Sequence, residues 1–532
     1  MLRISQLILP VGHTPEQLRK KLLRTAHMKE NELKSFAIRR RSLDARKKPE
    51  LYYVYTVDFS AENENRVIRQ TKGKAQKVTE KPYHVPKHGT ESLKERPVII
   101  GSGPAGLFCA YLLAIEGYSP LIVERGAPVR ERRKDIERFW ETGVLDTASN
   151  VQFGEGGAGT FSDGKLNTMV KDLAGRNRYV LEIFVKFGAP GEILWEQKPH
   201  IGTDILIGVV EAMRGEILRL GGEFRFRSQV TDILPKENCI VINNEEKIRT
   251  EAAVLAIGHS ARDTFSMLYG RGFSMEAKSF AVGVRVEHPQ RMIDTVTYGR
   301  EERGVLGAAA YKLTEKTDNG RGVYTFCMCP GGYVVNASSE EGCLAVNGMS
   351  YHDRAGENAN SAVIVTVTKE DYGSDHPLSG VEFQRRLERR AWEEGKGNVP
   401  VQRFADFCEG KATERPGHIR PNIKGAYQFG NVRNIFPEEI AESLEKGIRG
   451  MDRRIHGFAD DDTLLSGVES RTSSPVRITR GEDFTANVPW VYPCGEGAGY
   501  AGGITSAAMD GMKVAEAIIR RYANQYSQNF NP

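Results

Sequence analysis

The sequence predicts an α/β protein built from a small N-terminal α/β domain, a parallel-sheet domain in two pieces, and an antiparallel-β domain inserted between those pieces. Three observations predict this fold class. A glycine-rich strand–turn–helix pattern begins at Pro97, a second begins at Val491, and strand-like runs dominate between residues 276 and 480. Because 532 residues exceed one ordinary core, two to four domains are expected.

The N-terminal segment combines strand and helix patterns with a strongly basic composition. Residues 1–60 alternate between strand, helix and strand, so they predict a small basic α/β domain, whereas polar residues 61–96 predict a linker or arm. Residues 1–96 carry 22 Lys and Arg against 11 Asp and Glu, while the rest carries 52 against 58. The basic runs at 39–41 and 46–48 could contact phosphates. A charged strand edge that discourages aggregation is the simpler explanation.

The first glycine-rich turn has the features of a dinucleotide site. The apolar run at 98–100 enters a turn with Gly101, Gly103 and Gly106, and a helical pattern follows. Gly101 permits the turn, Gly103 lets the backbone approach a pyrophosphate, and Gly106 allows close helix–strand packing. The first N–H groups of the helix then face the phosphates.

A second strand at 120–123 is followed by Glu124, twenty-one residues beyond Gly103. A carboxylate at this distance can hold a ribose hydroxyl. Arg125 and the arginine-rich run at 130–138 come next, and an arginine here could reach the pyrophosphate, although most of such a run should face solvent. We therefore expect residues 97–275 to form the first part of the dinucleotide-binding domain.

Residues 153–168 contain five glycines, at positions 154, 156, 157, 159 and 164. Each would cost up to about 1 kcal/mol in a packed helix or strand. They favour a segment whose backbone lies against a flat ligand, with Gly159 and Thr160 among its contacts. A mobile glycine loop is the alternative.

The second half of the chain predicts an inserted domain and a return to the first. A helix at 205–220, a strand at 223–226, a hairpin-like pair of strands across residues 243–244 and a buried strand ending at Gly258 complete the first piece. Residues 276–480 predict the antiparallel insert. Residues 481–532 supply the second glycine turn and a long helix, and two such grips suit the long FAD molecule better than NAD.

Several longer motifs carry a family resemblance. They are FGEGGAGTFSDGKLNT, TFCMCPGGYVVNASSE, NGMSYHDR, ESRTSSPVRI and PCGEGAGYAGGITSAAMDG. Together with the turn at 101–106 and Glu124, they resemble the bacterial FAD-dependent dehydrogenase family of the FAD/NAD(P)-binding Rossmann superfamily, over nearly the whole chain. The resemblance implies an FAD/NAD(P)-binding Rossmann-like domain with an inserted antiparallel-β substrate domain, and FAD as cofactor. It implies no particular substrate.

The resemblance also assigns cofactor contacts. The pyrophosphate would lie at Gly101, Ser102, Gly103, Ala105 and Gly106, the ribose at Glu124, the adenine at the Val230 backbone, the ribityl chain at Gly495 and Glu496, and the flavin pyrimidine edge at Gly503, Ile504 and Thr505. Similar flavoproteins commonly have Asp where this chain has Glu496. Because a reduced flavin is negative near N1 and O2, a helix N-terminus at that edge would stabilise it.

The substrate is expected where residues 276–480 face the loop at 153–168. Candidate catalytic groups are Asp163, Lys165, Arg471, Cys327 and Cys329. Arg471 could hold a carboxylate or phosphate or tie its loop to the core. Strand alternation would point both cysteines to one face, as a redox relay or as buried structural cysteines. His200 and His259 are acid–base candidates, although core or surface positions are commoner.

Composition excludes several classes of protein. Seven scattered cysteines without a CxxC pair argue against a secreted disulfide framework and predict no structural metal. We expect no membrane span and a cytoplasmic location. The leading function is an FAD-dependent oxidoreductase acting on a small molecule, with NAD(P)H as a transient donor. The alternatives are an RNA-modifying flavoprotein anchored by its basic N-terminal domain and a flavoprotein with structural FAD. The sequence leaves substrate, electron acceptor and oligomeric state open.

Overall fold

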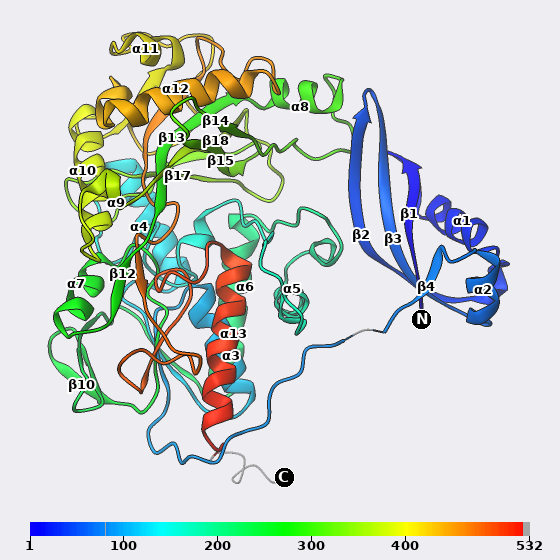
Figure 1. Cartoon of the computed structure of the whole chain (residues 1–532), viewed down its shortest axis with the longest axis horizontal. Coiled ribbons are helices and arrows are strands. Elements are labelled where there is room, and N and C mark those ends of the chain that lie inside the picture. Colours follow the sequence, from blue (N-terminus) through cyan, green and yellow to red (C-terminus); the bar gives the residue numbers. More distant parts are fainter. Residues whose placement is uncertain (80, 525–532) are drawn as a thin grey trace.

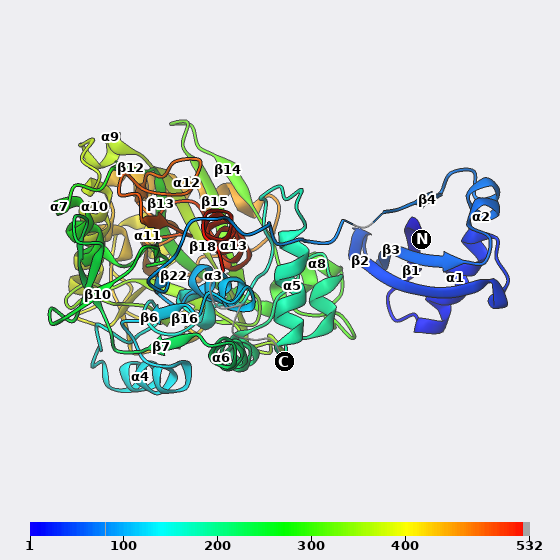
Figure 2. The same cartoon turned by 90° about the horizontal axis from the view of Figure 1, so that it is seen from below.

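The computed structural model describes residues 1–79 and 81–524. A small N-terminal sheet with its helices stands beside a larger body, and an extended segment joins the two (Figure 1). The view from below keeps the same separation (Figure 2). Within the described residues, none of the helices combines the length and the hydropathy that crossing a membrane requires.

The N-terminal sheet is antiparallel, with strand order β2-β3-β1-β4. Helix α1 begins after Thr14, whose hydroxyl accepts the N–H of Gln17 while the Gln17 side chain accepts the N–H of Thr14, a capping box. The elements are β1 (Leu2–Pro10), α1 (Pro15–Ala26), a 3-10 turn (Glu30–Glu32), β2 (Leu33–Lys47), β3 (Glu50–Ala61), α2 (Glu64–Gln70) and β4 (Ala75–Lys77).

The expected linker at 61–96 begins later than predicted. Its first part folds into α2 and β4, and β4 pairs with β1 so that Ala75 lies opposite Ile4. Val67 and Ala75 are each the single buried side chain of their element, too few to produce a visible periodicity. From residue 81 the chain is extended and reaches the end of the last helix, where Gly89 N–H donates to the Ile519 carbonyl oxygen at 2.8 Å.

The central sheet of the body is parallel, with order β24-β11-β5-β6-β7. Strands from the two ends of the body therefore belong to one sheet, with β11 between β24 and β5. The strands are β5 (Val98–Ile100), β6 (Leu121–Val123), β7 (Glu223–Arg225), β11 (Ala253–Leu255) and β24 (Val491–Pro493). A separate antiparallel sheet holds β8 (Val230–Leu234), β9 (Cys239–Ile242) and β10 (Glu246–Arg249).

Helices surround the parallel sheet, and α3 and α13 lie side by side in both views (Figure 1, Figure 2). Their buried faces share one apolar core. The helical elements are α3 (Pro104–Ile115), α4 (Val129–Thr142), α5 (Arg176–Lys186), α6 (Thr203–Arg219), α7 (Arg262–Gly270), α13 (Ile504–Arg521), and 3-10 turns Ala158–Phe161 and Gly191–Leu194.

Between β11 and β24 the chain forms a seven-stranded sheet, order β14-β15-β18-β13-β22-β19-β21. Its pairs are antiparallel except β19 with β21. The strands are β13 (Phe280–Pro289), β14 (Thr314–Lys316), β15 (Gly322–Cys329), β18 (Asn358–Val367), β19 (Val399–Arg403), β21 (Tyr427–Phe429) and β22 (Leu464–Glu469).

Two smaller sheets and several helices complete this region. The sheets pair β12 (Met275–Ala277) with β23 (Val476–Ile478), and place β16 (Tyr333–Asn336) between β17 (Val346–Met349) and β20 (Ile423–Lys424). The helical elements are α8 (Gln290–Tyr298), α9 (Lys369–Tyr372), α10 (Ser379–Glu394), α11 (Phe404–Glu409), α12 (Glu438–Asp452) and a 3-10 turn Val432–Ile435. Apart from the start of the linker, the domain boundaries given above stay predictions.

Candidate functional site

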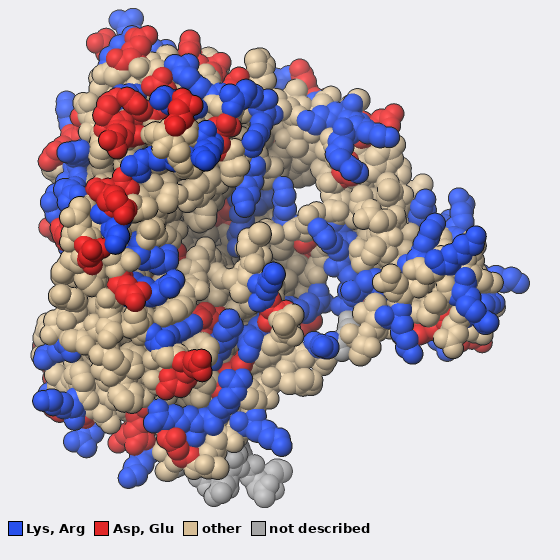
Figure 3. Space-filling model, viewed as in Figure 1, with Lys and Arg blue, Asp and Glu red and all other residues tan. Residues whose placement is uncertain are grey.

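A continuous cavity of about 1470 Å³ runs between the parallel sheet, the seven-stranded sheet and the N-terminal hairpin β2–β3. The surface is deeply hollowed between the N-terminal sheet and the body (Figure 3). The predicted cofactor residues that line the cavity are Gly101, Gly103, Ala105, Glu124, Arg125, Gly159, Val230, Gly258, Glu496, Gly503 and Ile504. The predicted residues Ser102, Gly106, Thr160, Gly495 and Thr505 lie beside this lining rather than in it.

The two glycine-rich turns meet at this cavity. A Cβ on Gly511 would lie 2.1 Å from the Ala105 carbonyl oxygen, and a Cβ on Gly495 would lie 2.7 Å from the Ala105 Cβ. Helix α13 therefore packs directly on the first turn of α3. The first N–H groups of an α-helix have no acceptor within the helix, and its N-terminus carries partial positive charge. Both helix N-termini border the same cavity, at Gly103 and Gly503.

Glu124 organises the loops around the first turn. One carboxylate oxygen accepts the Ser102 N–H at 2.9 Å and the Ser102 hydroxyl at 2.8 Å. The other accepts the N–H groups of Gly126, at 2.9 Å, and Gly154, at 3.0 Å. These four donors fill the usual acceptor sites of a carboxylate. Glu124 thus ties the turn after β5, the end of β6 and the 153–168 loop together, and its contact with a ribose stays a prediction.

Arg132 holds the 153–168 loop from below, although the sequence suggested that its run mostly faces solvent. Its fully buried guanidinium donates to the carbonyl oxygens of Asn150, Val151, Gly154, Glu155 and Gly157 at 2.7–3.2 Å. Burial lowers its pKa to about 10. Sequence gave no signal for it, because Arg130, Arg133 and Lys134 look the same in the pattern.

The two glycine-rich turns, at 101–106 and 495–505, and the 153–168 loop together form a glycine-lined cradle on one side of the cavity. This cradle fits a long nucleotide. A Cβ on Gly157 would lie 2.9 Å from the Gly103 Cα, so only glycine at position 157 lets the backbone of the 153–168 loop approach the first turn this closely. His259 lines the same space, with Nδ1 3.2 Å from Glu496 Oε1. Its Nε2 is buried without a hydrogen-bond partner among the described residues. Such an orphaned polar atom is commonly satisfied by a ligand or ordered water.

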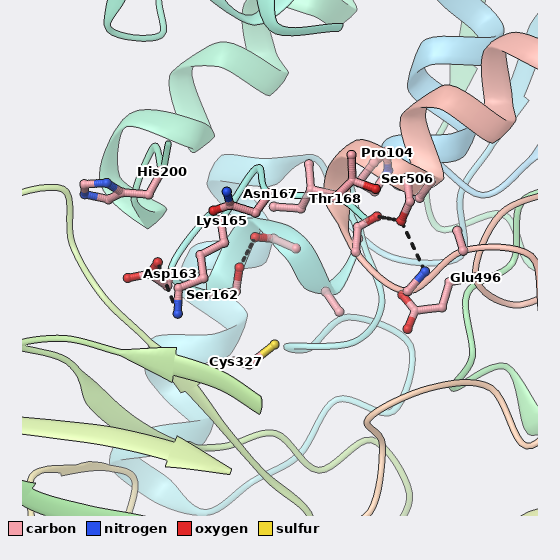
Figure 4. Close-up of a pocket in the computed structure, with 18 of the residues that line it drawn as sticks. Pro104, Ser162, Asp163, Lys165, Asn167, Thr168, His200, Cys327, Glu496 and Ser506 are labelled. Carbon is pink, nitrogen blue, oxygen red and sulfur yellow. Dashed lines mark hydrogen bonds and ion pairs between the residues drawn. The ribbon is translucent and has the colours of Figure 1, made fainter. Parts of the chain in front are cut away.

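A second lobe of the cavity contains charged groups. Arg354 holds Asp163 through two hydrogen bonds, of 3.0 and 2.6 Å, and Lys165 Nζ lies 4.0 Å from the same carboxylate. Lys165 and Cys327 line this lobe, with the Lys165 ammonium turned toward Asp163, whereas Pro104, Ser506 and Glu496 line the opposite side of the cavity (Figure 4). The structure thus brings Asp163, Lys165 and Cys327 together beside the cofactor cradle. The sequence did not indicate Arg354, because it lies 191 residues from its partner.

Two histidines stack at the far side of this lobe. The rings of His200 and His352 are 5.2 Å apart, and His200 Nε2 lies 3.1 Å from the His352 carbonyl oxygen. Burial, with a smaller effect of Arg354, lowers the pKa of His200 to about 4. His200 is therefore neutral near pH 7.

The two cysteines do not follow the predicted alternation. A register shift after Phe326 forms a bulge in β15, and Cys327 has φ +41°. Cys327 is consequently exposed to the cavity while Cys329 is buried. Burial among surrounding protein raises the pKa of Cys327 to about 12, although Arg285 opposes the shift. Both thiols are free and neutral, and a relay between them stays a prediction.

Arg471 lines the cavity, but its guanidinium already has partners. It donates to both Glu388 oxygens, at 3.0 and 2.9 Å, and to Ser339. The same carboxylate accepts Arg262 at 2.6 Å. These contacts are those of an arginine that ties its loop to the core. A role in binding substrate stays a prediction.

The N-terminal hairpin closes one side of the cavity. Arg41 of β2 is paired with Glu196, and its guanidinium lies over the rings of Tyr53 and Trp195 at 4.7 and 4.5 Å. The Arg41 N–H donates to the Trp195 carbonyl oxygen at 2.7 Å. Apolar residues of the hairpin, including buried Leu51, pack on the core of the seven-stranded sheet. One predicted basic run therefore contacts the body.

Comparisons with known proteins agree with this site. Residues 279–472 match the family described as FAD-dependent protein, C-terminal domain-like; residues 99–141 match an NAD(P)-binding Rossmann-like domain; residues 1–60 match a domain of unknown function. An uncharacterised protein of Clostridium beijerinckii is 45% identical over 529 residues, which cover 98% of this chain and 99% of that protein.

Solved structures resemble the chain only distantly. The flavin-dependent halogenase CmlS is 12% identical, with a TM-score of 0.36, over 82% of this chain and 60% of its own. CtdE in complex with FAD and substrate 4 is 12% identical, with a TM-score of 0.33, over 80% of each chain. These values are too low to support an argument about mechanism. The full-length relative and the family matches suffice: the chain belongs to the bacterial family of FAD-dependent proteins, in which an FAD-dependent C-terminal domain is combined with a Rossmann-like nucleotide-binding domain.

Proposed function

We propose that this protein is an FAD-dependent oxidoreductase that moves a hydride between FAD and a small-molecule substrate, with NAD(P)H as a transient donor. One observation carries the proposal. The glycine-lined cradle and the lobe containing Asp163, Lys165 and Cys327 are parts of the same cavity. A molecule in this lobe would adjoin whatever the cradle holds.

Each part of the cavity has a task in this proposal. The N-termini of α3 and α13 offer free N–H groups to the pyrophosphate and to the flavin edge. His259 Nε2 and the Glu496 carboxylate are placed to bind polar groups of the cofactor. Bound FAD supplies two-electron chemistry, so the protein contributes placement and electrostatics. Asp163 and Lys165 are the candidates to orient substrate beside it.

Anaerobic photometry of the FAD-loaded protein tests this function. NADH, NADPH and a panel of small metabolites are added separately, and bleaching of the flavin absorption band identifies the reductive partner. Oxygen uptake after readmission of air then separates a dehydrogenase from an oxygenase. Bound FAD that no donor bleaches would overturn the proposal and leave a structural role for the cofactor.

RNA binding through the N-terminal domain gains no support from the contacts of its arginines. Arg3 and Arg39 pair with buried Asp58, Arg46 pairs with Asp44, and Arg41 is engaged by Glu196. An RNA-binding assay at low salt tests this alternative, because phosphate contacts are strongest there.

A further inference from the structure

The substrate lobe has more positive charge than its own carboxylates balance. Four carboxylates line this part of the cavity, at Asp163, Glu192, Glu196 and Glu469. Each already faces a partner on the protein: Arg354 for Asp163, His352 at 3.9 Å for Glu192, Arg41 for Glu196 and Arg285 at 3.0 Å for Glu469. Lys165, Lys198 and Lys312 also belong to the lining.

These lysines lack a carboxylate partner of their own. Lys165 reaches Asp163 only at 4.0 Å, and Arg354 has already bound both oxygens of that carboxylate. Among the residues that the structure describes, no carboxylate lies within 4.0 Å of the ammonium of Lys198 or Lys312. Burial lowers the pKa of Lys198, and the positive charges of Lys165 and Arg354 lower it further. Lys165, Lys198 and Arg354 therefore bring three positive charges near one another, and the carboxylate beside Lys165, Asp163, is already bound by Arg354.

We propose that Lys165 and Lys198 bind the anionic head of an organic substrate, a carboxylate or a phosphate, in the lobe between the 163–168 segment and the β15 bulge. This inference rests on the proposed function and names its substrate class. An anion here would give both ammonium groups a charge-assisted partner. It would also relieve their mutual repulsion, which is large where water is partly excluded.

The position of the site relates the anion to the cofactor cradle. The Lys165 ammonium turns toward Asp163, and Cys327 lies between this group and Glu496 in the view of Figure 4. Burial raises the pKa of the Cys327 thiol, and the positive charge of Lys165 acts in the opposite direction and lowers it. The rest of a substrate whose head is bound by Lys165 can therefore extend past Cys327 toward the cradle. Substrates without an anionic group would lose this anchor.

Cys327 offers a chemical probe of the charge. Among the seven cysteines, all in the described part of the chain, it is the exposed one. Its thiolate displaces iodide from iodoacetate or iodoacetamide, and the thiol proton goes to the buffer. Both reagents need the thiolate, so the ratio of their rates reports the local charge and not the thiol pKa. Peptide mass spectrometry measures each rate at Cys327 in the FAD-loaded protein.

Two results are expected. The iodoacetate-to-iodoacetamide ratio should fall at least about fivefold in K165Q/K198Q, as expected for loss of nearby unit charges, and should be retained in the charge-conserving variant K165R/K198R. Lys171→Gln, an exposed change outside the lining, should leave it unchanged. Millimolar malonate or inorganic phosphate should also slow iodoacetamide labelling of the wild-type protein, whereas glycerol should not. Stronger protection by malonate indicates a carboxylate substrate, and by phosphate a phosphorylated one.

An unchanged ratio in folded K165Q/K198Q, or no protection by either anion, would overturn the anion site. The labelling requires no electron transfer. A protein that fails every reduction test can therefore still pass this one, and the two proposals fail separately.

Discussion

Replacing Glu124 with Gln tests whether this carboxylate organises the site before any cofactor binds. Two buried backbone N–H groups, of Gly126 and Gly154, donate to one oxygen, and the N–H and hydroxyl of Ser102 donate to the other. An amide nitrogen cannot accept a hydrogen bond. In its better orientation it faces Ser102, whose hydroxyl can rotate, but the Ser102 N–H is left without an acceptor.

The expected cost follows from these contacts. One buried unsatisfied N–H costs about 1–3 kcal/mol. The remaining hydrogen bonds also lose their charge, and charge-assisted bonds are roughly twice as strong as neutral ones. We expect E124Q to lower the free energy of unfolding of the cofactor-free protein by about 2–4 kcal/mol. Weaker FAD binding should accompany this loss.

Urea unfolding of the cofactor-free protein, followed by FAD titration, is the assay. E131Q is the matched control, because Glu131 is exposed on α4. If Glu124 acted on the ribose alone, E124Q would weaken FAD binding and leave the cofactor-free stability at the wild-type value. That outcome would refute the loop-organising role.

Three further variants test other contacts. G511A should lower stability by about 1–3 kcal/mol through overpacking, because its Cβ would meet the α3 backbone. G208A is the control, since its Cβ meets nothing within 4 Å, and it should gain up to about 1 kcal/mol. Urea unfolding of both variants measures the difference. Burial raises the pKa of Glu287 from 4.5 to about 7. Between these two pH values the folded protein holds a proton on Glu287 that the unfolded chain has released, so the free energy of unfolding falls as the pH rises from 4.5 to 7. E287Q should remove this fall and be about 3 kcal/mol more stable than wild type at pH 8 but equal at pH 4, by thermal unfolding. E388Q removes the carboxylate that both Arg262 and Arg471 bind and leaves Arg262 with Glu340 alone, at 3.4 Å, so it should cost about 3–5 kcal/mol. E393Q, an exposed change on the same helix, should stay within about 0.5 kcal/mol.

Each of these predictions has an outcome that contradicts it. Equal stability changes in G511A and G208A would mean that α3 and α13 separate without cost. A wild-type pH profile in E287Q would place the titration on another group. A stable E388Q would show that the two arginines find other partners or water.

The sequence predicted the parts of the site whose chemistry is local. A strand, a glycine turn and a helix within about twenty residues set the conformation of Gly101–Gly106 and of the 495–505 segment, and parallel strands then bring both turns to one sheet edge. Glu124 lies at the first turn because β6 is the neighbour of β5, and its contact with a ribose stays a prediction. The second grip was also expected, and β24 lies two strands from β5.

The sequence could not predict contacts that depend on a bulge or on partners far along the chain. The alternation expected for Cys327 and Cys329 was wrong, because one extra residue in β15 turns one thiol to the cavity and buries the other.

By itself, the sequence determined the two glycine-rich turns that line the cavity, since glycine spacing and the adjoining strands and helices act over short stretches of chain. Only the tertiary structure decided which charges face one another. Arg132 beneath the glycine loop, Arg354 on Asp163 and Arg41 on Glu196 each join segments that share no local pattern. The physical reason is that a salt bridge or a buried guanidinium depends on the final positions of distant segments, whereas a turn depends on its own few residues.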